Sequence, residues 1–433
     1  MSDIGIGLLS IIVIFIFLFA RMPVAYIMIV VGMAGYAIIT SIPAALSVGS
    51  STMFSTFTSY SLTVIPLFVW MAYIAYYAGI SRRVFDATYK VTGRIPAGLA
   101  LATIGASTAF GAICGSTTAT AATMSTVSLP EMKRYEYNDS LATATVASSG
   151  VLGIMIPPSV IFIIYGISTG ESIRQLFMAG VVPGIMLMLL FMLVIFVQAW
   201  KNPSLAPNGP KVSWNDKFSS ILNGSVEVVI IFIAVVGGLF AGLFTETEAG
   251  AVGAFSTLLV AVIRKQIDWE GFKNSLTDAI QISAMILFLV AGATIFGRFL
   301  AVTGLPTAMA NWAVELPLPS VAVLAIILFI YLILGFFIDA LALILLTVPI
   351  FYPVAVELGF DPVWFGVIIV LVVGMGVITP PVGANVYVVA GIDKDTPVMT
   401  IFRGIWPFLG AIIFLLAILM AFPQVALFLP GLI

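Results

Sequence analysis

Residues 154–159 read Ile-Met-Ile-Pro-Pro-Ser, and residues 377–382 read Val-Ile-Thr-Pro-Pro-Val. Each stretch places two consecutive prolines inside a long apolar segment, and the two pairs lie 223 positions apart (380 − 157). Proline removes a backbone N–H and clashes with the carbonyl of residue i−4, so each pair predicts an unwound stretch within a helix. The same offset also pairs Gly153 with Gly376, Pro130 with Pro353, and Ser116 with Asp339. This register predicts an internal repeat.

Composition places the chain in a membrane. Of 433 residues, 61% are hydrophobic and 8% are charged, and the mean hydropathy is +1.20. Soluble domains average about 25% charged residues, so a water-soluble enzyme is excluded. Apolar runs such as 4–20, 221–243 and 408–422 suit helices that cross a bilayer core of about 30 Å. The sequence therefore predicts an all-α polytopic membrane protein.

The charged and reactive residues exclude several other classes. The net charge is −2 and the basic residues form no patch of the kind that nucleic acid requires. The chain has no histidine and one cysteine, Cys114, which excludes histidine-based catalysis and an internal disulfide. The N-terminus lacks the basic region of a cleaved signal peptide, so we expect residues 4–20 to remain as a helix.

The distribution of Lys and Arg predicts the topology. Loops rich in these residues stay cytoplasmic, and this rule places the N-terminus in the periplasm, with spans near 23–40 and 57–79 and only Arg174 and Arg298 away from the cytoplasmic side. Residues 201–219 read as a cytoplasmic linker, and the amphipathic segments Ser81–Thr92 and Asp268–Asp278 as interfacial arms. The expected divisions are N-terminal scaffold helices with a first arm (1–95), a first hairpin and broken helix (96–175), scaffold helices with the linker and second arm (176–319), a second hairpin and broken helix (320–400), and a C-terminal helix (401–433).

Two segments, 97–130 and 320–357, are long enough to enter the membrane and turn back. By the charge rule the first enters from the cytoplasm and the second from the outside. Opposed repeats with discontinuous helices are typical of secondary transporters, which hold substrate and ions near the midplane. The sequence thus predicts two inverted halves, each with a re-entrant hairpin and a broken helix.

Small and hydroxylated residues fill the centre of the first hairpin, from Gly111 to Met124. Such a run also suits a tightly packed helix pair, but its register with a second irregular segment favours a tip that binds a cation and an anion.

Asp339 is a carboxylate in an apolar segment, where a charge costs about 2.5–3.5 kcal/mol, so we expect a function besides helix capping. Asn385 offers an amide after the second break. Arg298 suits either a substrate carboxylate or an interfacial position, whereas Glu246 and Glu248 suit the capping of a helix N-terminus.

The chain resembles, over essentially its whole length, the large membrane subunit of tripartite ATP-independent periplasmic (TRAP) transporters. The motifs that carry the resemblance are Gly115-Ser-Thr-Thr-Ala-Thr-Ala121, Gly153-Ile-Met-Ile-Pro-Pro-Ser159 with Tyr165-Gly166, Leu176-Phe-Met-Ala-Gly180 with Pro183-Gly184, Thr245-Glu-Thr-Glu-Ala-Gly-Ala251, and the aspartate hairpin ending in Pro349 and Pro353. The resemblance implies a sodium-coupled elevator-type importer in the bacterial inner membrane, whose substrates are organic anions such as sialic acids, C4-dicarboxylates, sugar acids and keto acids. It also implies a small four-helix membrane subunit, expected here as a separate chain, and a periplasmic substrate-binding protein. In this chain Thr117-Thr118 replaces a serine pair that is common in the family.

On this basis we expect two or more Na+ ions and one organic anion. The expected sodium ligands are Gly115, Ser116, Thr117, Gly153, Ile156, Pro157, Gly335, Asp339, Gly376, Ile378, Thr379 and Pro380. The expected substrate-binding residues are Ser116, Thr118, Arg298, Asp339 and Asn385. No catalytic residue is expected.

Two alternatives keep the transporter class: proton coupling through Asp339, and transport of an organic anion without a binding protein. An intramembrane enzyme is disfavoured because the chain offers no histidine and few groups that could form a nucleophile–base pair. A passive channel would need a continuous polar pore rather than two closed hairpin tips.

Overall fold

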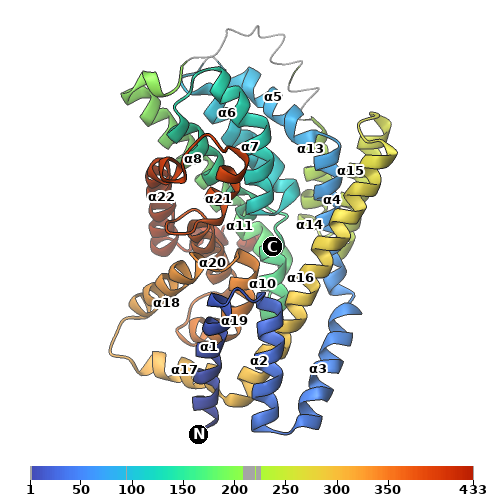
Figure 1. The fold of residues 1–433 in the computed structure, drawn as a ribbon, viewed down its shortest axis with the longest axis vertical. Coiled ribbons are helices and arrows are strands. Elements are labelled where there is room, and N and C mark those ends of the chain that lie inside the picture. The colour runs from blue at the N-terminus through green and yellow to red at the C-terminus, as the bar shows by residue number, and fades with distance from the viewer. Residues whose placement is uncertain (1, 94, 208–219, 221–225, 433) are drawn as a thin grey trace.

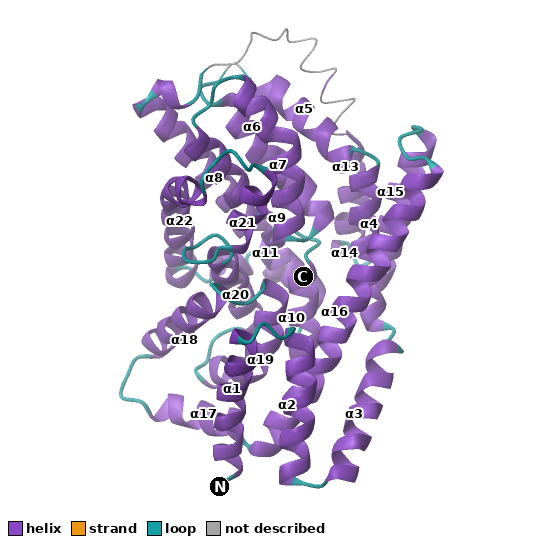
Figure 2. Ribbon diagram, in the orientation of Figure 1, coloured by secondary structure: helices purple, strands orange, loops and turns teal. Residues whose placement is uncertain are grey.

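Every regular element that the structure describes is helical (Figure 2). The computed structural model describes residues 2–93, 95–207, 220 and 226–432, and this part of the chain contains no strand. The all-α prediction is therefore confirmed. Most of the expected linker 201–219 and the start of the apolar run 221–243 lie outside the described residues.

The described residues up to 207 contain eleven α-helices and two short 3-10 turns. They are α1 (Asp3–Phe19), α2 (Val24–Ile39), α3 (Ile42–Phe57), η1 (Ser61–Thr63), α4 (Val64–Tyr77), α5 (Ile80–Thr92), α6 (Gly98–Cys114), α7 (Thr117–Arg134), α8 (Asp139–Ser149), α9 (Leu152–Met155), α10 (Val160–Thr169), α11 (Ile173–Lys201) and η2 (Pro203–Leu205).

The described elements of the second half run from α13 to a short turn near the C-terminus. Its elements are α13 (Val226–Phe232), the π-helical stretch η3 (Ile233–Gly237), α14 (Gly238–Phe240), α15 (Glu246–Ile263), α16 (Trp269–Thr303), α17 (Leu305–Glu315), α18 (Ser320–Gly335), α19 (Ala340–Glu357), α20 (Pro362–Gly376), α21 (Ala384–Ile392), α22 (Val398–Ala421), α23 (Gln424–Leu427) and η4 (Pro430–Leu432).

Element boundaries repeat with the offset of 223 found in the sequence. Helix α7 starts and ends 223 positions before α19, and α10 and α21 end at Thr169 and Ile392, which have the same separation. Helices α2 and α15 match within one residue under this offset, and α5 and α17 within two. In Figure 1 the first hairpin, α6–α7, lies in the upper half of the molecule and the second, α18–α19, in the lower half.

One pair of repeated elements differs in shape. Helices α3 and α4 are bent by 56° around residues 58–60, whereas their counterpart α16 is continuous over 35 residues. The prediction of a separate arm at Asp268–Asp278 is therefore wrong: Asp268 caps α16 by accepting a hydrogen bond from the Gly271 N–H at 2.7 Å, and no proline interrupts the helix after it. Helix α3 was not expected from the sequence, because it is rich in Ser, Thr and Gly.

Packing divides the helices into two bodies. Helices α1–α4 and α13–α16, here called the scaffold, are built around α2 against α16 and α15 against α4. Helices α6–α11 and α18–α22, here called the hairpin body, pack together through α8 against α22, α7 against α21, and α10 against α19. Helix α11, expected in the scaffold, instead contacts α22, α20 and α6. The arms α5 and α17 lie between the bodies, α5 on α6 and α17 on α19.

Length and apolar composition allow several helices to cross a bilayer. Among the described residues, five helices meet both requirements, or up to seven if each of two bent helix pairs is one span.

The predicted capping role of Glu248 is confirmed at the start of α15, where its side chain accepts from the Thr245 N–H at 2.8 Å while the Thr245 hydroxyl accepts from the Glu248 N–H. This capping box satisfies two N–H groups that the helix leaves free.

Candidate functional site

A cavity of about 700 Å³ lies between the scaffold and the hairpin body. The tips of both hairpins line it, with Ser116, Thr117 and Thr118 from the first and Asp339, Ala340 and Leu341 from the second. The opposite wall comes from scaffold helices α4 and α16, and α21 contributes Val388 and Ile392. Two segments far apart in the sequence therefore converge on one chamber, as the 223-residue register predicted.

The first tip is a helix break followed by a helix N-terminus. Gly115 ends α6 in the left-handed conformation, with φ of +63°, which glycine adopts without steric cost. Ser116 is extended and caps α7: its Oγ accepts from the Ala119 N–H at 3.4 Å and lies 3.4 Å from the Thr118 hydroxyl. The positive end of the α7 dipole therefore faces the cavity.

The second tip has the same construction with a different cap. Asp339 caps α19 by accepting a hydrogen bond from the Leu341 N–H at 3.0 Å, and its carboxyl group is reached from the cavity. Capping and exposure to the cavity thus coexist at Asp339. In the part of the chain that the structure describes, neither arginine nor lysine lines this cavity.

Each hairpin packs against the broken helix of its own repeat. Helix α9 ends at Met155 and α10 begins at Val160, while α20 ends at Gly376 and α21 begins at Ala384, which confirms both predicted breaks. Both proline pairs, Pro157-Pro158 and Pro380-Pro381, contain a cis peptide bond. A Cβ on Gly115 would lie 2.9 Å from the Pro158 carbonyl oxygen, and one on Gly376 would lie 3.0 Å from the Gly335 Cα. Glycine at these positions allows tip and break to touch.

Several polar oxygen atoms gather near the first break. A Cβ on Gly153 would lie 2.6 Å from the Thr120 Oγ1 and 2.8 Å from the Ser116 carbonyl oxygen. The Thr120 hydroxyl and the Ser159 hydroxyl are buried and have no partner among the described residues. Buried hydroxyls of this kind usually find a partner, so they are available to a ligand. Thr120 and Ser159 were not expected as site residues, although both lie inside quoted motifs.

The remaining predicted sodium ligands lie at the two breaks. Ile156 is buried in extended backbone directly after α9. At the second break Ile378 is buried, and the Thr379 hydroxyl donates to the Met375 carbonyl at 2.6 Å while Thr379 and Pro380 are half-buried. Both sets of oxygens therefore belong to the hairpin body.

Two predicted substrate residues lie away from the cavity. Asn385 is fully buried; its amide group donates to the Ala147 carbonyl at 3.1 Å, and its Oδ1 has no partner among the described residues. Arg298 is exposed on α16 and is not part of the cavity lining. The structure therefore brings Ser116, Thr118 and Asp339 together and leaves Asn385 and Arg298 outside the chamber.

The cavity wall on the scaffold contains polar residues that sequence patterns did not single out. Tyr73, Tyr76 and Tyr77 come from α4 and Asp278 from α16. The Tyr77 hydroxyl donates to the Asp278 Oδ2 at 2.7 Å. Because this pair joins residues 201 positions apart, no local motif could reveal it.

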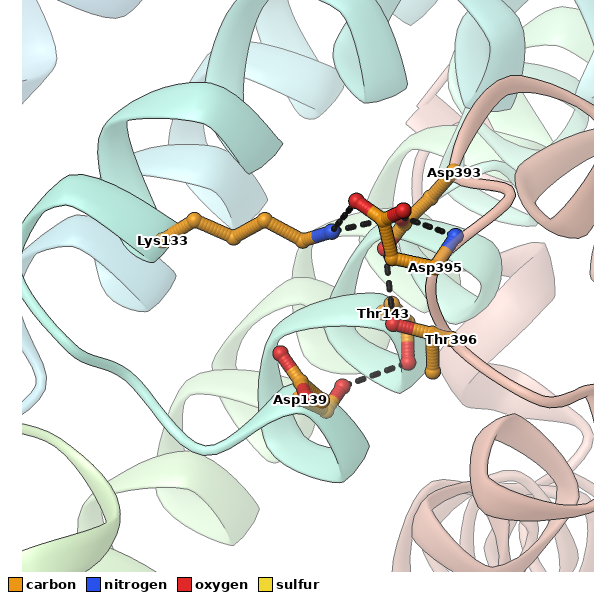
Figure 3. Close-up of polar contacts among 6 residues, drawn as sticks. All are labelled: Lys133, Asp139, Thr143, Asp393, Asp395 and Thr396. Carbon is orange, nitrogen blue, oxygen red and sulfur yellow. Dashed lines mark hydrogen bonds and ion pairs between the residues drawn. The ribbon is translucent and has the colours of Figure 1, made fainter.

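Polar contacts cross between the repeats at both ends of the hairpin body. Figure 3 shows Lys133, at the end of α7, with Asp393 and Asp395 from the loop between α21 and α22; the Nζ–Oδ1 distance to Asp393 is 2.5 Å. At the other end, the Tyr352 hydroxyl on α19 donates to Glu171, between α10 and α11, at 2.6 Å. We call these contacts the two clasps. Each joins the second helix of one hairpin to the loop after the broken helix of the other repeat.

Known proteins provide an independent comparison. The profile of the family described as "Tripartite ATP-independent periplasmic transporter, DctM component" matches residues 11–425. The chain is 33% identical over 380 residues to the C4-dicarboxylate TRAP transporter large permease protein DctM of Pseudomonas aeruginosa, covering 88% of each chain. It is 33% identical over 416 residues to the sialic acid TRAP transporter large permease protein SiaM of Vibrio cholerae, covering 96% of each. Among solved structures, the YdaH transporter of Alcanivorax borkumensis aligns with a TM-score of 0.61 at 13% identity, covering 88% of this chain and 89% of that one. That last likeness concerns the fold alone.

Proposed function

The chain belongs to the DctM-component family of tripartite ATP-independent periplasmic transporters, and from this premise we propose that it couples sodium entry to uptake of an organic anion by an elevator movement. It is a multi-pass inner-membrane permease subunit for organic acids, and its relatives are permeases rather than enzymes. The observation that carries the proposal is the convergence of two capped helix N-termini on one cavity.

The cavity suits a small organic anion. Its volume of about 700 Å³ falls within the usual range of small-molecule sites. The N-termini of α7 and α19, capped by Ser116 and Asp339, turn the positive ends of two helix dipoles toward the cavity, which favours a carboxylate. Since neither lysine nor arginine from the described residues lines the chamber, a bound cation would supply the missing positive charge.

Sodium would bind where each tip meets its break. At the first break the Ser116 carbonyl and the unpartnered Thr120 hydroxyl converge on Gly153. At the second, Asp339 lies at the tip, and the Gly335 backbone meets Gly376. Unwound carbonyls and helix ends coordinate sodium in other transporters. Sites for Ca2+ draw on several carboxylates, whereas the oxygens at these two breaks include one carboxylate, Asp339, which suits a monovalent ion.

In the proposed movement the hairpin body slides along the scaffold and carries the anion with it. Both sodium sites and both anion-binding tips lie on the hairpin body, so they would travel as one unit. The arms α5 and α17 pack against α6 and α19 and would connect the moving body to the scaffold.

The orientation follows from the basic residues. Lys133 and Arg134 end α7, and Arg82, Arg83 and Lys90 lie on α5; both helices lie in the upper part of the molecule in Figure 1. By the positive-inside rule, this end would face the cytoplasm and the N-terminus would face the periplasm. The scaffold residue Tyr77 ends α4 just before α5, so the cavity reaches toward the cytoplasmic side in this arrangement.

The proposed system includes two further proteins: a small four-helix membrane subunit and a periplasmic binding protein that delivers the anion. Transport without a binding protein is the alternative for delivery. Coupling to protons instead of sodium is the alternative for the driving force, because the Asp339 carboxylate at the second tip is a titratable group that faces the cavity.

Uptake by proteoliposomes tests these alternatives. They contain this chain with its small subunit, and the loaded binding protein is supplied outside. We expect uptake to require an inward sodium gradient, and Asp339→Asn to abolish the dependence on sodium rather than on pH. Omission of the binding protein should stop uptake. Equal uptake with and without the sodium gradient would refute sodium coupling, and loss of pH dependence alone in Asp339→Asn would favour protons.

A further inference from the structure

We propose that the substrate is a polyhydroxylated monocarboxylate, such as a sugar acid, rather than a dicarboxylate. This inference rests on the proposed transport function and narrows its substrate class. The feature that carries it is the scaffold wall of the cavity, formed by Tyr73, Tyr76, Tyr77 and Asp278, which faces the same chamber as the hairpin tips.

The two sides of the chamber differ in chemistry. On the hairpin side, the positive ends of the α7 and α19 dipoles suit a carboxylate, and the negative charge of Asp339 at the second tip would be offset by the proposed sodium ion. On the scaffold side, Asp278 is a carboxylate that accepts hydrogen bonds when ionised and offers about four lone-pair sites. Tyr77 occupies one of its oxygens through the 2.7 Å bond. The remaining acceptor capacity suits hydroxyl donors on the substrate.

The tyrosines strengthen the match to a polyol. A tyrosine hydroxyl both donates and accepts, and its ring presents an apolar face to the C–H surface of a hydroxylated chain. Tyr73, Tyr76 and Tyr77, which lie near the C-terminal end of α4, line the wall beside Asp278. A ligand with one carboxylate and several hydroxyls can therefore place its charge at the tips and its hydroxyls at the wall.

A dicarboxylate fits this arrangement poorly. Its second carboxylate would face Asp278, and like charges at contact distance repel, more strongly where water is partly excluded. The described lining offers neither lysine nor arginine that could offset this repulsion. Asp278 is thus a specificity-determining residue that attracts hydroxyls and rejects a second negative charge.

Four six-carbon probes separate the two effects. D-Gluconate and hexanoate share one carboxylate and differ in hydroxyls, and D-glucarate and adipate are the corresponding pair with two carboxylates. Binding of each to the purified full-length chain is measured by calorimetry with and without saturating sodium. We expect wild type to bind gluconate at least about tenfold more tightly than hexanoate and glucarate, the scale of a lost hydrogen bond to a charged group.

Asp278→Asn provides the decisive variant, because it removes the charge and preserves the shape. We expect the preference for gluconate over hexanoate to fall by about tenfold, and glucarate and adipate to gain affinity relative to gluconate. Glu270→Gln, an equal charge change on the same helix away from the cavity, is the control and should change none of the four affinities. Tyr77→Phe removes the hydrogen bond from the Tyr77 hydroxyl on α4 to Asp278 on α16 and retains the aromatic ring.

The outcomes distinguish this inference from the proposed function. If adipate or glucarate binds more tightly than gluconate in a sodium-dependent manner, the substrate class is wrong and sodium coupling stands. If Asp278→Asn and Tyr77→Phe weaken all four probes equally, the Asp278–Tyr77 pair is a structural link and the specificity role is refuted. If gluconate binds at the predicted preference but independently of sodium, the substrate class stands and the proposed coupling fails.

Discussion

Removal of the Lys133 ammonium group should destabilise the hairpin body without altering the cavity. The Asp393 side chain is 5% exposed, and Lys133 is its cationic partner at 2.5 Å (Figure 3). In Lys133→Met the carboxylate stays buried and keeps the hydrogen bonds from the Thr396 hydroxyl at 2.8 Å and the Asp395 N–H at 3.3 Å. The variant therefore leaves a partly satisfied negative charge inside the protein.

The size of the effect follows from burial. Breaking a fully buried ion pair costs about 3–5 kcal/mol. Lys133 is 32% exposed, and Asp393 retains two donors, so we expect a loss of about 2 kcal/mol from the free energy of unfolding. Asp395 is 91% exposed and its contact with Lys133 should contribute less than about 0.5 kcal/mol.

The pH dependence provides a second signature. Burial acts to raise the pKa of Asp393, but the bonds from Lys133 and Thr396 outweigh it and hold the pKa below its usual value. For Lys133 burial acts to lower the pKa, and the two carboxylates outweigh it and raise the pKa. The stability from Asp393 is thus present above about pH 4, the unfolded value, and lost as pH falls through its lower folded pKa. The stability from Lys133 is present below about pH 10.4 and lost as pH rises through its higher folded pKa.

Thermal or denaturant unfolding of the purified protein measures the effect. Between about pH 5 and 9 the gap between wild type and Lys133→Met should be constant, and it should narrow below about pH 4. Lys394→Met removes the same charge from an exposed neighbour and is the control, and Asp395→Asn tests the weaker contact. A Lys133→Met protein as stable as Lys394→Met, or a gap that widens on acidification, would refute the reasoning.

Three other contacts make further predictions. Glu227→Gln should lower the free energy of unfolding by about 3 kcal/mol, because this carboxylate is 2% exposed and lies 3.1 Å from Arg83 and 2.8 Å from Arg264. The control is Glu136→Gln, which changes an exposed carboxylate. Equal stability of the two variants would contradict this prediction. Arg174→Leu should lower the population of the conformation described here, relative to other conformations, by about tenfold. Arg174 donates to the Phe240 carbonyl, and among the described residues this is the single side-chain hydrogen bond between the scaffold and the hairpin body. Spin-label distances between the two bodies measure the shift, and unchanged distances would contradict it. Gly153→Ala should abolish sodium-dependent anion binding, because its Cβ would lie 2.6 Å from the Thr120 hydroxyl and 2.8 Å from the Ser116 carbonyl, whereas Gly410→Ala, which meets nothing within 4 Å, should bind normally; normal sodium dependence in Gly153→Ala would exclude this position from the ion site.

Patterns along the sequence predicted the features that depend on short segments. Apolar runs predicted the helices, and paired prolines predicted both breaks. The offset of 223 paired Ser116 with Asp339, and both residues line one cavity in the structure. Helix α3 was missed because its Ser, Thr and Gly content weakens the apolar signal that marks a span. The separate arm at Asp268–Asp278 was wrong because a strong N-cap at Asp268 and the absence of proline allow α16 to continue.

Contacts between distant segments could not be predicted in this way. Tyr77 and Asp278 meet only because α4 and α16 pack side by side, and neither residue belongs to a local motif. Asn385 follows the second break, yet its amide binds the Ala147 carbonyl of the first repeat rather than the cavity. A register of repeats predicts which residues are equivalent, but it does not predict which repeat each side chain contacts.

The two clasps follow from this interlocking of the repeats. Lys133 of the first hairpin binds the loop after α21, and Tyr352 of the second hairpin binds Glu171 after α10, so each contact crosses from one repeat to the other. The contacts join corresponding elements of the two repeats and differ in chemistry: an ion pair at one end and a neutral hydroxyl donor at the other. If each repeat were held only by contacts within itself, the two tips could drift apart when the hairpin body moves. The clasps add to the helix packing between the repeats, α7 on α21 and α10 on α19, which would hold Ser116 and Asp339 at a fixed separation across the cavity during the proposed movement.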